Sequence, residues 1–94
     1  MKRSNVYRLI EGEREYQSFD PHQYGQDDAL RSVADWVVFI EAHVAKAKHC
    51  IYELDEKKAC EEIRKVAALA VACMEHHETA PRLTDEGGAT NGEG

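Results

Sequence analysis

The segment Val66–Met74, with the sequence VAALAVACM, places nine consecutive apolar residues between two charged turns. We interpret it as part of a helix that is apolar on every side rather than along one stripe. A helix of this kind must be covered all round by other parts of a structure. A chain of 94 residues has few other elements with which to cover it. The run therefore predicts an assembly in which this helix packs among several subunits.

Apolar residues near helical spacing predict a first helix over about residues 4–18, with Ser4 or Asn5 as its cap. Asp20-Pro21 stops this helix, because the residue before a proline is driven out of the α region. The following segment, residues 19–28, is rich in turn formers and predicts a loop.

Two further helices are predicted, joined by a tight link. One begins near residue 28 or 32, where Ser32 and Asp35 resemble a capping box, and runs to about residue 51. The other covers about residues 56–77, with Asp55 as its cap. No segment shows the alternation typical of a strand.

These patterns predict an all-α fold: an antiparallel helical hairpin plus an N-terminal helix, assembled into an oligomeric helical bundle. We expect a homo-oligomer, as a dimer, a tetramer or a larger assembly. The domain is predicted over residues 1–78. Residues 79–94 are rich in glycine and polar residues, which predicts a flexible C-terminal tail.

Composition restricts the partners. The net charge is −6 and no lysine or arginine cluster stands out, which argues against duplex nucleic acid as a partner. A few local cations are nevertheless enough for a small anionic ligand. No stretch approaches the roughly 20 apolar residues of a membrane span.

The three cysteines, Cys50, Cys60 and Cys73, form no CxxC pair. An odd number of cysteines without a signal peptide indicates reduced thiols in the cytoplasm. Cys60 and Cys73 fall in helical patterns and are expected to be small buried side chains. A disulfide between Cys50 and Cys60 across the link is the alternative.

His43 is unusual on the predicted second helix, because it shares an apolar face with Trp36, Ile40 and Val44. It is either a core or interface histidine with one hydrogen-bond partner or a ligand-binding residue. In the second case the ring of Trp36 could stack on a nucleobase.

Four cations on the two paired helices are candidates for gripping phosphates: Lys46, Lys48, Arg64 and Lys65. The alternative is that they are ordinary charges on helix surfaces.

Carboxylates on the same helices are candidates for a magnesium site, because hard cations take oxygen ligands from several side chains. Glu41, Glu61 and Glu62 are the residues concerned. The alternative is that they are solvated or form ion pairs along a helix, such as Glu61 with Lys65. No pattern of nucleophile and base is present, and no catalytic residue is assigned.

Three segments together resemble a group of small phage and prophage proteins that are similar to the MazG-type all-α nucleotide pyrophosphohydrolases. They are Glu13–Gln17 (EREYQ), Ser32–Ala47 (SVADWVVFIEAHVAKA) and Glu61–His77 (EEIRKVAALAVACMEHH). The resemblance covers roughly residues 13–82. It implies a helical bundle formed by dimerisation or tetramerisation, with magnesium held by acidic motifs on two successive helices.

Carried over residue by residue, the resemblance implies an incomplete metal motif. Glu41 and Glu62 match acidic positions of the family, whereas Ala42 and Ala45 stand where further acids are expected. Lys65 stands in the place of an aspartate, and its ammonium could occupy the position of the cation. The resemblance therefore implies nucleotide binding without hydrolysis.

Three functions are consistent with the sequence. The first is an oligomeric nucleotide-binding protein without a cofactor, which sequesters a linear or cyclic immune signalling nucleotide in phage–host conflict, in the host cytoplasm. The second is a divergent Mg²⁺-dependent nucleoside triphosphate pyrophosphohydrolase, which would need a further carboxylate such as Asp27 or Asp28. The third is a phage protein that inhibits a host protein without a small ligand. For the first function the expected ligand-binding residues are Trp36, His43, Lys46, Arg64, Lys65 and Tyr16.

Overall fold

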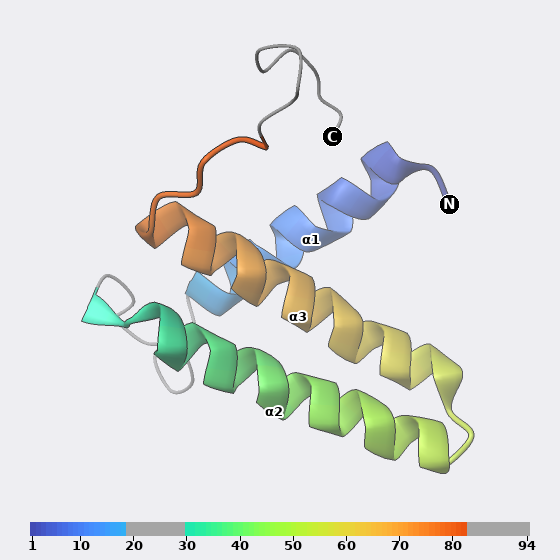
Figure 1. The fold of residues 1–94 in the computed structure, drawn as a ribbon. Coiled ribbons are helices and arrows are strands. Elements are labelled where there is room, and N and C mark those ends of the chain that lie inside the picture. Colours follow the sequence, from blue (N-terminus) through green and yellow to red (C-terminus); the bar gives the residue numbers. More distant parts are fainter. Residues whose placement is uncertain (19–29, 83–94) are drawn as a thin grey trace.

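The computed structural model describes residues 1–18 and 30–82. In these residues the chain forms three helices and no strand: α1 over Arg3–Ser18, α2 over Val33–Tyr52 and α3 over Glu56–His76 (Figure 1). The all-α prediction is confirmed at this level. The predicted loop at 19–28 and most of the predicted flexible tail lie outside the described residues.

Local hydrogen bonds fix the start of α2. The Ser32 hydroxyl accepts a hydrogen bond from the Asp35 backbone N–H at 3.1 Å, and the Asp35 carboxylate accepts one from the Ser32 N–H at 2.9 Å. This is the predicted capping box, with aspartate in place of glutamate. Hydrogen bonding to Ser32 lowers the pKa of Asp35. The contribution of the Ser32 backbone N–H is larger than that of the Ser32 hydroxyl.

The predicted cap of α3 is confirmed, whereas the predicted start of α1 is corrected. The Asp55 carboxylate accepts a hydrogen bond from the Lys58 N–H at 3.0 Å, as expected of a cap for α3. Helix α1 begins earlier than predicted, because the Lys2 carbonyl already accepts from the N–H groups of Asn5 and Val6. Ser4 and Asn5 are therefore inside the first turn and do not cap the helix.

Helices α2 and α3 lie side by side and run in opposite directions (Figure 1). The link between them is short because Leu54 adopts a left-handed backbone conformation, with φ of 62°. The Asp55 N–H then reaches back to the Cys50 carbonyl at 2.9 Å. Such a conformation costs some free energy for a residue with a side chain. It reverses the chain within three residues, Glu53–Asp55.

Helix α1 crosses the outer side of α3 (Figure 1). Two ion pairs hold the crossing: Arg14 with Glu75 at 2.8 Å and Arg64 with Glu13 at 2.9 Å. In addition, the Gln17 side-chain amide donates to the Lys65 carbonyl at 3.3 Å. The position of α1 therefore depends largely on polar contacts.

The apolar core is small. Trp36, Leu69 and Ala72 are buried at its centre, with Phe39, Ile40 and Cys73 packed against them. A second cluster, Ala47, Cys50 and Ala59, lies nearer the link. The helix α3 is thus covered on two sides by its own chain.

The apolar run Val66–Met74 is only partly buried within one chain. Ala68, Leu69 and Ala72 are fully covered, whereas Val71 and Met74 remain exposed. On the face of α2 predicted to be apolar, Val44 and Ile51 are exposed as well. Covering of this surface by other subunits stays a prediction.

The cysteines are free, as expected, but one of them is not buried. Cys50 is buried, Cys73 is partly covered and Cys60 is exposed. The prediction of a buried Cys60 was wrong, because this residue lies on the side of α3 that faces away from the core. Within the described part of the chain, no helix is both long enough and apolar enough to cross a membrane.

Candidate functional site

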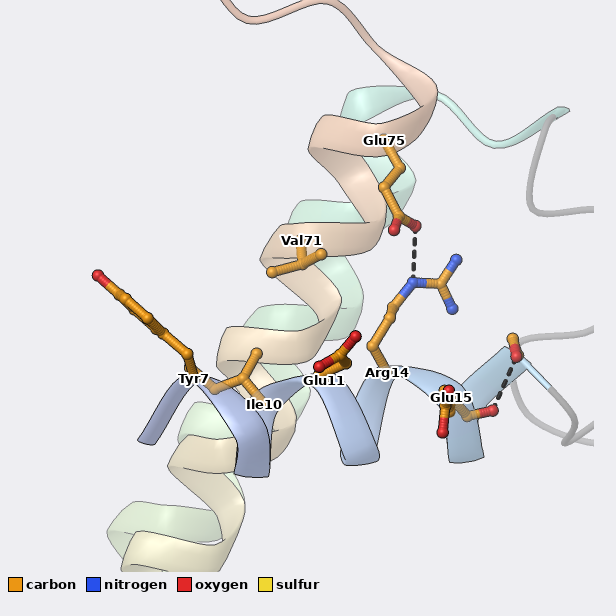
Figure 2. Close-up of a pocket in the computed structure, with 8 residues that line it drawn as sticks. Tyr7, Ile10, Glu11, Arg14, Glu15, Val71 and Glu75 are labelled. Carbon is orange, nitrogen blue, oxygen red and sulfur yellow. Dashed lines mark hydrogen bonds and ion pairs between the residues drawn. The ribbon is translucent and has the colours of Figure 1, made fainter. Parts of the chain in front are cut away.

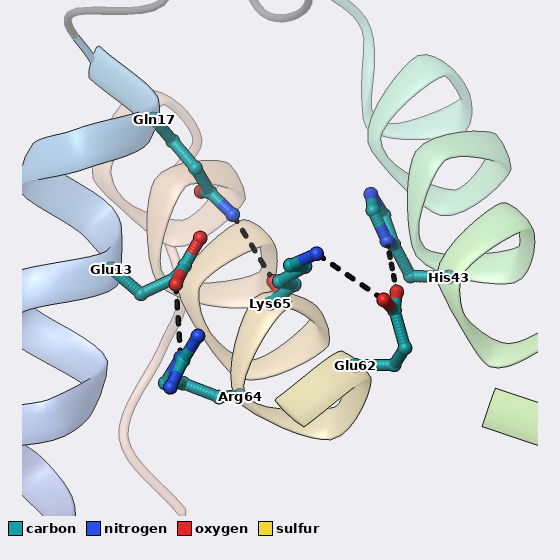
Figure 3. A network of polar contacts seen from close by, with 6 residues as sticks. All are labelled: Glu13, Gln17, His43, Glu62, Arg64 and Lys65. Carbon is teal, nitrogen blue, oxygen red and sulfur yellow. Dashed lines mark hydrogen bonds and ion pairs between the residues drawn. The ribbon is translucent and has the colours of Figure 1, made fainter. Parts of the chain in front are cut away.

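A buried polar cluster lies where α2 and α3 pack together (Figure 3). Nδ1 of His43, from the middle of α2, lies 2.8 Å from Oε1 of Glu62. The Lys65 ammonium, one turn later on α3, lies 3.2 Å from Oε2 of the same carboxylate. Because a carboxylate only accepts hydrogen bonds, Nδ1 of His43 is the donor in this pair. Both oxygens of Glu62 are thus occupied by nitrogen donors.

The environment of Glu62 sets its charge. Burial by itself would raise the pKa of this carboxyl group, since a charge loses solvation in the interior. The hydrogen bonds from His43 and Lys65 outweigh that effect and hold the pKa of Glu62 below its ordinary value. Glu62 is therefore an anion at neutral pH and accepts hydrogen bonds from two sides.

Gln17, near the end of α1, lies beside this cluster, and its side-chain amide donates a hydrogen bond to the Lys65 carbonyl (Figure 3). It is only 2% exposed, and its side-chain oxygen has no hydrogen-bond partner in the structure. The indole N–H of Trp36 is likewise buried without a partner. Buried polar atoms without partners are uncommon in folded proteins. The sequence analysis did not find Gln17, because its position in an amphipathic α1 gave no sign of burial.

The residues predicted to bind the phosphates lie in different parts of the molecule. His43 and Lys65 meet at Glu62, whereas Arg64 turns to the other side of α3 and pairs with Glu13. Lys46 lies on α2 and lines a groove that also includes Glu62.

The two predicted stacking rings differ in access. Trp36 is 1% exposed and stacks on His76 of α3, with ring centroids 6.1 Å apart. Its ring therefore belongs to the core and does not face solvent. Tyr16 is 64% exposed on α1 and remains accessible.

An open groove of about 380 Å³ between α2 and α3 lies beside the polar cluster. Its lining includes Lys46 and His49 from α2 and Lys58 and Glu62 from α3. His49 pairs with Glu53 at 3.2 Å, while Lys46 and Lys58 make no ion pair with any residue that the structure describes. The groove thus presents two ammonium groups from opposite helices.

Lys58 was not among the predicted ligand residues. It lies four residues before Glu62 and seven before Lys65, so the three share one face of α3. That spacing is a signal by which Lys58 could have been found from the sequence.

The predicted magnesium ligands are not gathered within one chain. Glu41 and Glu61 are exposed, and only Glu62 points into the structure. The reason is helical geometry: Glu41 is two residues before His43 and so lies about 200° away around α2. Among the described residues no three His, Cys, Asp or Glu side chains could hold a metal ion together. Asp27 and Asp28, considered as further ligands, lie outside those residues.

The predicted pairing of Lys65 is also corrected. The sequence suggested an ion pair with Glu61 four residues earlier, whereas the structure pairs Lys65 with Glu62 at three residues. Glu61 faces solvent, while Glu62 lies on the inner side of α3 together with Lys65.

A second concave surface of about 450 Å³ lies in the angle between α1 and α3 (Figure 2). Its charged residues are Glu11, Glu15 and Glu75 against Arg14, which is already paired with Glu75. This acidic surface disfavours an anionic ligand, so the groove at Lys46 and Lys58 is the better candidate for one.

Comparison with protein-family models, with curated proteins and with solved structures gives no match, so the function has to be argued from this geometry.

Proposed function

We propose that this chain is a nucleotide-binding protein that holds its ligand without a metal ion and without hydrolysing it. The observation that carries the proposal is the pair of hydrogen bonds accepted by the Glu62 carboxylate. Its two oxygens are occupied by His43 and Lys65 at 2.8 and 3.2 Å. Because each oxygen already accepts a hydrogen bond and the adjacent Lys65 ammonium repels a second cation, magnesium binding at Glu62 is disfavoured.

In this proposal the Lys65 ammonium stands in for a bound cation beside Glu62, with one positive charge in place of the two of Mg²⁺. In a related hydrolase the corresponding acids would hold Mg²⁺, which neutralises the phosphates and polarises them for attack. A lysine neutralises the charge of the phosphates but supplies no metal-bound water. The substitution therefore separates binding from turnover.

In this proposal the phosphates bind in the groove between α2 and α3. Lys46 and Lys58 carry positive charge into it from both sides, and neither is neutralised by a described acid. A volume of about 380 Å³ lies within the range of small-molecule sites. No stacking ring is assigned, because Trp36 is enclosed in the core and the exposed Tyr16 of α1 does not line this groove.

The biological role proposed is sequestration of a signalling nucleotide, linear or cyclic, by a phage-encoded protein in the host cytoplasm. A binder that does not turn over its ligand removes the signal in proportion to its own concentration. Self-association is part of the proposal, with the α2–α3 hairpin and α1 building a helical bundle from several copies.

The test is a thermal-shift panel of linear and cyclic nucleotides, each with and without Mg²⁺. We expect at least one nucleotide to raise the melting temperature equally with and without metal. The ligand should be recovered intact after the protein is denatured. Absence of a shift with every nucleotide would overturn the proposal. Turnover to pyrophosphate that disappears in Glu62→Gln would overturn the non-hydrolytic part and favour the enzyme.

Charge reversal locates the site. Lys46→Glu combined with Lys58→Glu should abolish the shift, because the groove then repels phosphates. Lys57→Glu is the matched control: it changes an exposed neighbour of Lys58 that does not line the groove. Equal loss of binding in the control would show that only net charge matters and would contradict this location.

A further inference from the structure

The side of the α2–α3 pair away from the basic groove carries an uncovered apolar surface. On α2 the residues Val33, Val37, Val44 and Ile51 recur at spacings of four and seven, which places them along one flank of the helix. Each of them is between 40 and 51% exposed. On α3, Ile63 and Met74 are half-exposed along the adjoining flank.

These two flanks form one continuous surface. The groove between them, of about 470 Å³, is lined by Val44 and Ile51 from α2 and by Cys60 and Ile63 from α3. A second groove shares Cys60 and Ile63 and extends the surface to α1. Val6 and Leu9 contribute there. We name the whole set the apolar face; its larger members are Val6, Leu9, Val33, Val37, Val44, Ile51, Ile63 and Met74.

The size of the apolar face approaches that of a stable interface. Its eight large apolar side chains are 37–56% exposed, so the face presents apolar surface on the order of several hundred Å². The largest apolar patch of an ordinary monomer is about 300–600 Å², and a standard interface buries about 800 Å² on each partner. Ala67 and Ala70, which continue the stripe on α3, are small enough to let a second helix approach closely.

The charges at the edge of the face are complementary to themselves. Glu41 and Lys48 border the α2 flank on either side of Val44, and both are exposed. Neither makes an ion pair with the described residues. A two-fold axis near Val44 sets two copies of α2 antiparallel, so that Glu41 of each copy lies opposite Lys48 of the other. A partner of unrelated sequence would have no reason to match this order.

We propose that the apolar face is covered by the same face of a second copy of this chain, related by a two-fold axis near Val44. The two α2–α3 pairs then form a four-helix bundle, with the basic grooves on its outside. This inference does not depend on the proposed nucleotide binding, because it concerns the opposite side of the hairpin.

The first measurement is the mass in solution by light scattering at micromolar concentration. We expect a dimer or a multiple of two chains. Val44→Glu should give a monomer that keeps its helical circular dichroism, because a charge is then placed at the axis. Val38→Glu is the matched control, since Val38 is exposed on the other side of α2 and should leave the mass unchanged. Equal effects of the two variants, a monomeric wild type or a trimer would overturn the proposal.

Charge exchange tests the axis itself. Glu41→Lys and Lys48→Glu should each weaken dimerisation about tenfold, since the dimer contains two such pairs and each contributes about threefold. The double variant should restore association, because the pairs re-form with their signs exchanged. Double variants that dissociate further would contradict the two-fold arrangement. A full-length chain that stays monomeric while a variant without residues 83–94 dimerises would show that these residues cover the apolar face. That result would also overturn the proposal.

Discussion

Glu62→Gln is the most informative single change in the polar cluster. The amide keeps the size of the side chain but removes its charge and turns one acceptor into a donor. A hydrogen bond to a charged group contributes about 1.5–3 kcal/mol and a neutral one about 0.5–1.5 kcal/mol. One of the two bonds to His43 and Lys65 is therefore weakened and the other is lost.

The expected cost follows from these bonds and from their exposure. The Lys65 side chain is 34% exposed, so water compensates part of its loss. We expect a decrease of about 2 kcal/mol in the free energy of unfolding at neutral pH. For a domain of this size that corresponds to a fall of roughly 8–16 °C in melting temperature.

The assay is urea denaturation followed by circular dichroism, with Glu61→Gln as control. Glu61 is the exposed neighbour of Glu62, so its change should cost less than about 0.5 kcal/mol. A loss below about 0.5 kcal/mol in Glu62→Gln, or equal losses in both variants, would refute the reasoning.

The dependence on pH gives an independent check. Because the folded pKa of Glu62 is lowered, its stabilising contribution is present above the ordinary glutamate pKa. It is lost as the pH falls through the folded value. The difference between wild type and Glu62→Gln should therefore shrink as the pH falls below the ordinary glutamate pKa. A difference that stays constant as the pH falls would contradict the assignment of a charged Glu62.

Three further outcomes are expected. Leu69→Ala should lower the free energy of unfolding by about 3 kcal/mol in urea denaturation, because Leu69 is fully buried against Trp36; a loss below about 1 kcal/mol would contradict this packing. Ser32→Ala should cost about 1 kcal/mol in the same assay by removing the cap of α2, and an unchanged midpoint would argue against the capping box. Ala70→Glu should dissociate the proposed dimer and lower the melting temperature, since it places a charge on the partly exposed apolar flank of α3; an unaltered mass in light scattering, together with an unaltered melting temperature, would refute it.

Secondary structure could be predicted closely because its signals are local. The capping box at Ser32 and Asp35 and the cap at Asp55 join residues three positions apart, so their hydrogen bonds can be inferred from spacing. The start of α1 was missed by one or two residues, because it depends on the Lys2 backbone carbonyl rather than on a capping side chain.

The candidate site could be predicted only in part. The sequence singled out His43, Glu62 and Lys65 individually, but offered Glu62 as a metal ligand and Lys65 as a phosphate grip. In the structure they bind one another. The burial of Trp36 against His76 and the basic groove at Lys58 were likewise visible only once α2 and α3 were packed together.

The three helices, the caps of α2 and α3, and an excess of apolar surface over what one short chain can bury could be predicted from the sequence. These properties depend on spacing within a segment and on composition. Which polar groups meet depends on how the three helices pack. His43 and Glu62 are 19 residues apart in the chain, and Glu13 and Arg64 are 51 apart. The Gln17 amide donates to a carbonyl 48 residues away. Such contacts depend on how far each helix is rotated about its axis and where α1 crosses α3. A few tens of degrees of rotation would exchange a buried, neutralised glutamate for an exposed one, and the spacing along the chain does not specify that angle.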